Sequence, residues 1–278
     1  MKFKNLEDKC QYYRGLTDYR IQGNNDILVM LDGKNFSKLI KNNFKKPFDD
    51  DFIDMMNKTA QFLCENVQGC KFAYTQSDEI SLLITDYDTS ETDTLFGGRI
   101  CKIQSILASL ATSEFNRLFI KYQLEKTVTS DDYRFENVID KLMNMKLAQF
   151  DCKVWTVPNQ NDAFAWFLYR QLDCVKNSKQ QTAQTYLPHK VLVGQDADKQ
   201  IEMVKAFNGM DWNAFKAQYK FGRFIYKVET TETKMIPKLN NIITYTRNKF
   251  TPMPAWDLTT EEGKIKFIEK TFKFENND

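Results

Sequence analysis

The chain has 278 residues, 42% of them hydrophobic and 27% charged, as in an ordinary globular protein with a sizeable core. Its 39 basic and 37 acidic side chains nearly cancel, so any binding of nucleic acid has to come from a local basic patch. Six cysteines without a Cys-x-x-Cys pair and a single histidine argue against a structural zinc site and exclude catalysis by a histidine pair.

The N-terminal residues and the hydropathy of the chain predict its cellular location. It has no run of 18 apolar residues, the length that a membrane helix needs. The charged first eight residues lack the apolar centre of a signal peptide. We therefore expect a cytoplasmic protein with no membrane partner.

The first half of the chain shows alternating helix and strand signals. We expect a helix, a buried strand, a short helix and an amphipathic helix over residues 1–20, 27–31, 36–40 and 52–67. Residues 72–84 should form a β-hairpin or one long bent strand.

The second half continues this pattern. A helix should open after Gly97 and Gly98, a strand should cover residues 147–157, and a long helix should follow Pro158 and continue to about residue 180. Pro252 and Pro254 indicate a loop, and residues 261–272 an amphipathic helix. The order β-α-β-β-α-β predicts an α+β fold of ferredoxin-like, polymerase palm type, with additional helices and a C-terminal extension.

Carboxylates stand at two predicted strand ends. Asp32 and Gly33 follow the buried strand, and Asp78 and Glu79 stand at the crest of the hairpin. The simpler interpretation of the first pair is a strand that ends in an Asp-Gly turn. Alternatively, two aspartates on neighbouring strand ends can hold two Mg²⁺ ions, which serve phosphoryl or nucleotidyl transfer.

Six segments resemble motifs of the tRNA-histidine guanylyltransferase family, enzymes that add nucleotides to an RNA 5′ end in the 3′-to-5′ direction. They occur in the family's order, LDGKNF, NFKKPFD, AYTQSDE, FDCKV, YRQLDC and FGR, at residues 31–36, 43–49, 73–79, 150–154, 169–174 and 221–223. Thr75 replaces the glycine of the third motif, and Ser37 stands where many members have histidine.

The resemblance implies a catalytic centre with two Mg²⁺ ions. Asp32, Asp78 and the Gly33 carbonyl would be the metal ligands, and Asp32, Asp78 and Glu79 the catalytic residues. Glu79 has two interpretations, a metal-site residue or an exposed strand residue.

The resemblance also implies a nucleotide site for ATP, GTP and other nucleoside triphosphates. Backbone N–H groups at a helix N-terminus would cradle the triphosphate. The predicted nucleotide-binding residues are Asp32, Gly33, Lys34, Asn35, Phe36, Ser37, Lys46, Asp49, Ser77 and Asp78. Phe36 is equally well explained as a core residue, and Lys46 as a solvated surface lysine.

A second site, for another triphosphate or the RNA 5′ end, would lie on the helix after Pro158. It would comprise Arg170, Asp173, Lys176, Asn177 and Lys190. Arg170 and Asp173 alternatively form an intrahelical ion pair.

A further basic and aromatic surface for RNA is predicted near the last motif. It would comprise Lys216, Tyr219, Lys220, Phe221 and Arg223.

One departure from the family bears on specificity. Residues 175–178 read VKNS, where eukaryotic guanylyltransferases have His-Ile-Asn-Asn. The chain is therefore more similar to the guanylyltransferase-like branch, associated with template-dependent repair of 5′-truncated tRNAs. The alternatives are a dedicated enzyme that adds a single G to tRNA-histidine, a nucleotide cyclase, whose GG[DE]EF motif is missing, and a non-catalytic RNA-binding palm protein.

The family further implies a homotetramer that binds tRNA. We expect three segments: a palm-like catalytic segment over residues 5–133, a segment packed on it over 134–230, and an extension over 231–278.

Overall fold

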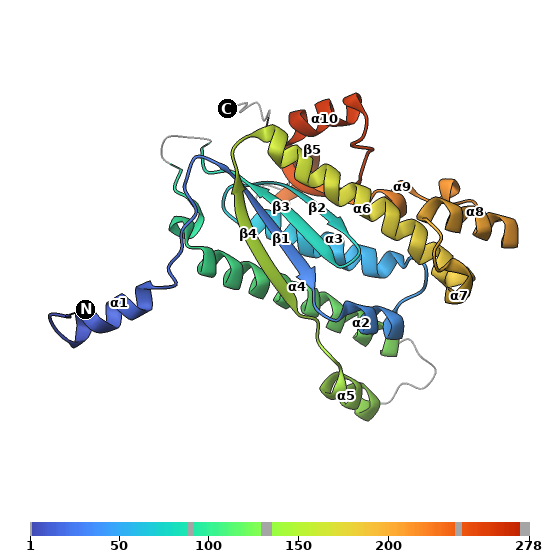
Figure 1. Cartoon of the computed structure of the whole chain (residues 1–278), viewed down its shortest axis with the longest axis horizontal. Coiled ribbons are helices and arrows are strands. Elements are labelled where there is room, and N and C mark those ends of the chain that lie inside the picture. The colour runs from blue at the N-terminus through green and yellow to red at the C-terminus, as the bar shows by residue number, and fades with distance from the viewer. Residues whose placement is uncertain (1, 88–91, 129–134, 237–240, 273–278) are drawn as a thin grey trace.

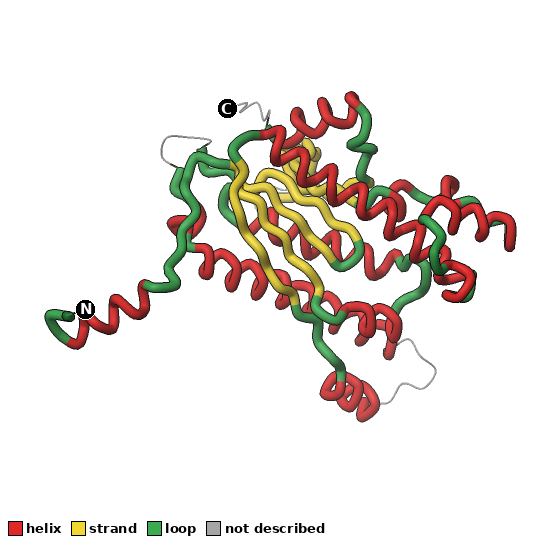
Figure 2. Tube along the Cα trace, viewed as in Figure 1, coloured by secondary structure: helices red, strands yellow, loops and turns green. Residues whose placement is uncertain are grey.

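The centre of the molecule is one six-stranded sheet (Figures 1 and 2). The structure, a computed structural model, describes residues 2–87, 92–128, 135–236 and 241–272. The strand order is β4-β1-β3-β2-β5-β6, and every neighbouring pair is antiparallel. The strands are β1 Asp26–Gly33, β2 Cys70–Gln76, β3 Glu79–Ile84, β4 Phe150–Val157, β5 Arg223–Ile236 and β6 Asn241–Pro254.

Helices cover both faces of this sheet, so the molecule has three layers. The helices are α1 Leu6–Gly15, α2 Phe36–Asn43, α3 Asp50–Asn66, α4 Ile100–Val128, α5 Phe135–Asn144, α6 Gln160–Tyr186, α7 His189–Leu192, α8 Ala197–Asn208, α9 Ala217–Lys220 and α10 Glu261–Thr271, with 3₁₀ turns at Leu95–Gly98 and Trp212–Ala214. Helices α3 and α4 pack on one face, and α6 and α10 pack on the other.

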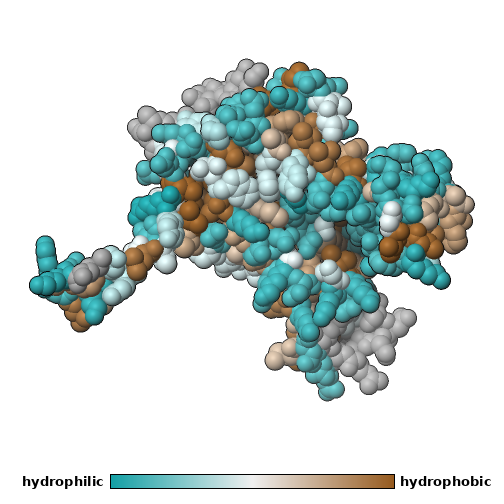
Figure 3. Space-filling model, in the orientation of Figure 1, coloured by the Kyte–Doolittle hydropathy of each residue, from teal (hydrophilic) through white to brown (hydrophobic). Residues whose placement is uncertain are grey.

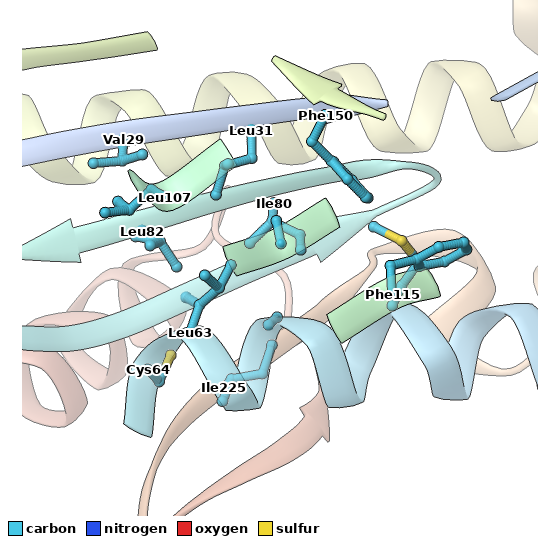
Figure 4. Close-up of a cluster of buried hydrophobic side chains, with 14 of the residues drawn as sticks. Val29, Leu31, Leu63, Cys64, Ile80, Leu82, Leu107, Phe115, Phe150 and Ile225 are labelled. Atoms are coloured by element: carbon cyan, nitrogen blue, oxygen red, sulfur yellow. The ribbon is translucent and has the colours of Figure 1, made fainter. Parts of the chain in front are cut away.

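The apolar run of β1 is continuous because both of its faces are buried. Val29 and Leu31 point toward α3 and α4, in the cluster shown in Figure 4, while Leu28 points toward α6. The same alternation puts Ile80 and Leu82 of β3 in the first cluster and Leu83 in the second. Asp32 shares a strand face with Leu28, so its carboxylate lies on the α6 side of the sheet.

The prediction of a fold that combines helices with a sheet is confirmed, and the sheet is antiparallel. Residues 72–84 form a hairpin, in which Gln76 of β2 pairs with Glu79 of β3. All three predicted segments contribute strands to the one sheet. The boundary between residues 133 and 134 lies outside the described residues, and the division into segments stays a prediction.

Two predicted elements differ from the structure. Pro252 and Pro254 belong to β6, where we expected a loop. Strand β6 pairs only with β5 and forms the edge of the sheet, where a proline can be placed without removing a ladder hydrogen bond. Residues 147–149 precede β4, since the side chain of Asn116 bonds the backbone of Ala148 at 2.8 and 3.0 Å.

The N-terminal helix is shorter than predicted and stands away from the body (Figure 1). Helix α1 has no buried residue, and its large side chains Leu6 and Tyr13 are exposed. Figure 3 shows its hydrophobic and hydrophilic side chains clear of the rest of the molecule. Among the described residues, no helix combines the length and hydrophobicity required to cross a membrane.

Asp26, at the start of β1, is a buried carboxyl group with one unsatisfied oxygen. Its side chain is 2% exposed, and the Tyr87 hydroxyl donates a hydrogen bond to Oδ1. Oδ2 has no hydrogen-bond partner within the described chain. Burial raises the pKa of Asp26, more than the bond from Tyr87 lowers it.

We expect Asp26→Asn to increase the free energy of unfolding at about pH 7, because the amide carries no charge and still accepts from Tyr87. The wild-type carboxyl loses stability as the pH rises from 3.8, its ordinary pKa, through its raised folded value. The gain should therefore vanish at about pH 3, where folded and unfolded states are both protonated. Denaturant unfolding at the two pH values measures this, and an equal gain at both would contradict it.

Candidate active site

Strand β1 ends beside the turn of the β2–β3 hairpin, so both lie where the central strands of the sheet end. Asp32 pairs with Glu79 across the two strands, and the Gly33 N–H donates to the Asp78 carbonyl at 3.1 Å. The two predicted metal ligands, Asp32 and Asp78, therefore come from adjacent strand ends. This juxtaposition follows from the hairpin pairing directly with β1.

Both aspartates are held in a way that disfavours their negative charge. Burial raises the pKa of Asp32, and the facing carboxylate of Asp151 raises it further, while Lys153 and Arg170 lower it. Burial also raises the pKa of Asp78; the Ser77 hydroxyl, which donates to it at 2.8 Å, lowers that pKa, and the charge of Asp32 raises it. A cation between the two would relieve this cost.

These residues fit Mg²⁺. The ion is commonly held by one or two carboxylates together with substrate phosphates and water, and does not need a complete cage of protein ligands. Within the described ranges, no group of three or more His, Cys, Asp or Glu side chains could hold a metal by itself. Asp32 and Asp78 therefore match the pattern of an ion that arrives with a nucleotide.

The turn next to Asp78 has a strained backbone. Ser77 has φ 46°, in the left-handed region that glycine prefers. Its side chain is exposed and bonds Asp78. Strain of this kind is found where a site requires a particular geometry.

The predicted phosphate cradle after Gly33 is only partly available. The Lys34 N–H donates to the Gln149 carbonyl at 2.8 Å, and the Gly33 N–H is also used, so neither can bind phosphate. No side chain caps the N-terminus of α2, where Asn35 is left-handed and Ser37 is exposed. The first turn of α2 is therefore the part of the cradle that can receive an anion.

Phe36 belongs to the core. Its ring is buried, and an added Cβ at Gly33 would lie 2.4 Å from it. The glycine after Asp32 thus gives room to this ring, and only the backbone of Phe36 remains for a ligand.

Glu79 is buried, contrary to its interpretation as an exposed strand residue. It is 4% exposed and accepts two hydrogen bonds from the Arg170 guanidinium, from Nε at 2.7 Å and from Nη2. Burial raises the pKa of Glu79, and Arg170 only partly offsets this. Glu79 thus has its partner within the protein.

The predicted ion pair within α6 is present. Arg170 Nη2 lies 3.0 Å from Asp173 Oδ2, which also accepts from Asn177 Nδ2 at 3.0 Å. Two carboxylates therefore already neutralise Arg170.

A cavity of about 300 Å³ opens beside Ser77. Its walls come from the segment before α3, from α6 and from the residues around α9. Phe48 and Tyr219 stack in it, with ring centroids 4.8 Å apart and an interplanar angle of 9°. Four α6 amides line it at helical spacing: Asn177, Gln180, Gln181 and Gln184. The cavity offers aromatic and amide groups of the kind that bind a nucleobase.

Comparison with known proteins identifies the family. The family model described as tRNAHis guanylyltransferase matches residues 8–158, more than half of the chain. The chain belongs to the tRNAHis guanylyltransferase family. Members of this family are nucleotidyltransferases, so the chain is an enzyme of that class.

Relatives of the family extend the match beyond residue 158. A probable tRNA(His) guanylyltransferase of Dictyostelium discoideum is 25% identical, over 74% of this chain and 77% of its own length. An uncharacterized protein of Acanthamoeba polyphaga mimivirus is 25% identical, over 97% of this chain and 91% of its own. The structure of a bacterial tRNA(His) guanylyltransferase-like protein in complex with ATP is 26% identical, with a TM-score of 0.75, and covers 95% of this chain and 98% of its own.

Several other predicted site residues either lie outside the cavity or already have partners within the protein. Lys46, Lys176 and Lys190 are exposed and do not line the cavity. Asp49 does line it, but its carboxylate caps α3 and accepts from the Asp51 N–H at 2.9 Å and the Lys45 N–H at 2.8 Å.

The predicted basic RNA surface near α9 does not form as one surface. Lys216 is paired with Asp50 at 3.2 Å, and Lys220 donates to the Asn213 carbonyl at 2.7 Å. Arg223, the first residue of β5, is buried and lines the cavity, so it is not part of an exposed surface.

Sequence reasoning missed the glutamines of α6 and the role of Asp151. The glutamines follow Asn177 at spacings of three, four and seven, which places them on one helix face. That spacing was a usable signal. Asp151 lies opposite Asp32 in the β1–β4 pairing, and no spacing in the sequence indicates this.

Proposed function

We propose that this member of the guanylyltransferase family is a Mg²⁺-dependent nucleotidyltransferase that adds nucleotides to tRNA 5′ ends in the 3′-to-5′ direction. The observation that carries the proposal is the pair Asp32 and Asp78, two carboxylates with raised pKa values on adjacent strand ends. Ser77, next to Asp78, lines a cavity of about 300 Å³. The similarity to a protein in complex with ATP supports a nucleotide in that cavity.

The strand order supports a palm-like core. In β4-β1-β3-β2, helix α3 connects β1 to β2 and helix α4 connects β3 to β4, the arrangement of a ferredoxin-like unit. Palm domains place their metal carboxylates at the strand ends of such a sheet, as Asp32 and Asp78 are placed here.

The residues have distinct roles in this proposal. Mg²⁺, when bound, lowers the pKa of an attacking hydroxyl and neutralises a triphosphate. Asp32 and Asp78 hold it, and the first turn of α2 binds phosphate oxygens. The rings of Phe48 and Tyr219 and the α6 amides hold the nucleoside.

The reaction has two steps. The 5′-phosphate of the RNA first attacks the α-phosphorus of ATP and releases pyrophosphate. The 3′-hydroxyl of the incoming nucleotide then attacks the activated 5′-phosphorus, and the phosphoanhydride bond breaks with release of AMP. We also propose that the enzyme works as a cytoplasmic homotetramer, which light scattering tests against the 32.7 kDa of one chain.

We expect addition to be directed by pairing to the opposite strand of the tRNA, because residues 175–178 differ from the signature of the dedicated enzymes. Template pairing supplies the selectivity, so the protein need recognise only shape and the 5′ end. The test incubates 5′-labelled truncated tRNAs, which differ in the opposing base, with Mg²⁺, ATP and each nucleoside triphosphate. Each tRNA should take up the matching nucleotide.

Full-length tRNA with no missing nucleotide is the control. Uptake of G alone, opposite every base and only on tRNA-histidine, would restore the dedicated guanylyltransferase. No uptake on any tRNA would contradict the proposed activity itself.

A further inference from the structure

Arg223 is a buried cation in the wall of the cavity. It is 4% exposed and begins β5, where it pairs with Thr75 of β2. Thr75 precedes Asp78 by three residues, so Arg223 lies near the same strand ends as the carboxylate pair. Ser77 and Arg223 both line the cavity.

The guanidinium of Arg223 is only partly satisfied. Its Nε donates to Asn57 Oδ1 at 2.9 Å. Nη2 has no hydrogen-bond partner in the part of the chain that the structure describes. A buried donor without an acceptor costs about 1–3 kcal/mol, and more when it is charged.

Arg223 also has no counter-ion among the described residues. The ionisable side chains that affect it are Cys174 and Tyr74. Burial keeps both neutral, since it raises the pKa of Cys174 to about 11 and raises that of Tyr74 well above its ordinary value. Burial lowers the pKa of Arg223 to about 10, which still leaves it charged at neutral pH. Arg170, by contrast, contacts both Glu79 and Asp173.

A buried, unpaired cation is expensive and is retained where something else provides its partner. An anion that enters the cavity would provide it. Phosphate supplies a full negative charge and oxygen pairs that match the planar guanidinium fork. A base carbonyl would satisfy one donor and leave the charge unbalanced.

We propose that Arg223 is the counter-ion of a nucleotide phosphate in the cavity beside Ser77. This inference rests on the proposed function, because it requires a nucleotide there. Arg223 of β5 would then bind the substrate phosphate, whereas Arg170 of α6 is already paired with Glu79.

The test measures binding by calorimetry of ATP, GTP and inorganic tripolyphosphate, each with Mg²⁺, to the full chain. Arg223→Met should weaken all three by a similar factor of about 10 to 100, the loss of charge-assisted hydrogen bonds. Arg223→Lys should lose less, because it keeps the charge without the fork. Without ligand, Arg223→Met should unfold at the same temperature as wild type or higher, since it removes an unpaired charge.

Arg117→Met is the matched control, because Arg117 is an exposed arginine paired with Glu114 and lies outside the cavity. It should bind all three ligands as wild type does. Loss of GTP binding alone would overturn the inference in favour of base recognition, and unchanged binding would overturn it outright. A lower unfolding temperature of Arg223→Met and Arg223→Lys, with wild-type binding, would show a structural role.

These outcomes separate the two proposals. If the wild-type chain binds tripolyphosphate and nucleotides in an Arg223-dependent way but adds nothing to tRNA, the function fails and the phosphate site stands. If it adds nucleotides and Arg223→Met binds them normally, only the assignment of Arg223 fails.

Discussion

Asp32→Ala and Asp78→Ala are each expected to abolish nucleotide addition and to leave the fold intact. Each removes one ligand of the proposed metal site, whose charge stabilisation in the transition state would be worth several kcal/mol, which corresponds to a rate loss of at least about 10³-fold. The folded state should not suffer, because burial and mutual repulsion already disfavour both charges. Addition is measured with labelled, 5′-truncated tRNA, and stability by thermal unfolding.

Asp54→Ala is the matched control for this pair. Asp54 lies on α3, is exposed, and contacts Lys58 at 2.5 Å, so its loss should change neither activity nor stability appreciably. Activity of Asp32→Ala or Asp78→Ala within about tenfold of wild type would remove that residue from the chemistry. A large drop in unfolding temperature would show that the carboxylate is needed for the fold.

The strands and the carboxylate pair could be predicted from the sequence because their signals are local. The apolar run of β1 and the strand formers around Ser77 each fall within a short stretch. Once β1 and the hairpin are neighbours in one antiparallel sheet, Asp32 and Asp78 lie at adjacent strand ends. Predicting that these two carboxylates lie together needed only the correct topology.

The partners that Arg170 and Arg223 find far along the chain could not be predicted in the same way, unlike the ion pair of Arg170 with Asp173 within α6. Arg170 and Glu79 are 91 residues apart, and they meet because α6 packs across the sheet. Asn57 and Arg223 are 166 residues apart and depend on β5 joining β2. The family resemblance implies a triphosphate or RNA 5′-end site for Arg170, and the basic and aromatic residues near Arg223 predict an RNA surface there. The structure pairs the first with acids and buries the second without one.

The buried ion pair between Glu79 and Arg170 should dominate the stability of the candidate active site. Both side chains are nearly inaccessible, and Glu79 also contacts Gln76 at 3.3 Å and Ser81 at 3.4 Å. Burial by itself would lower the pKa of Arg170, but the bonds and charge of Glu79 raise it above its ordinary value. The arginine is therefore held as a cation by this carboxylate.

Arg170→Met should reduce the free energy of unfolding by about 3–5 kcal/mol, because it leaves the buried carboxylate of Glu79 without its cation. Glu79→Gln should restore much of this loss in the double variant, since the amide carries no charge, its oxygen can accept from Gln76 and its nitrogen can donate to the Ser81 hydroxyl. Denaturant unfolding of both single variants and the double variant gives the coupling between the two positions.

Arg117→Met provides the comparison, because Arg117 is exposed although its partner Glu114 is buried, so water can replace the lost guanidinium and the loss should be smaller than in Arg170→Met. The loss in Arg170→Met should also grow as the pH rises. Burial already raises the pKa of Glu79, and without Arg170 the ionised carboxylate is opposed by burial and by the charges of Asp32 and Asp173. A loss no larger than that of Arg117→Met, or one independent of pH, would show that the buried pair does not hold α6 to the sheet.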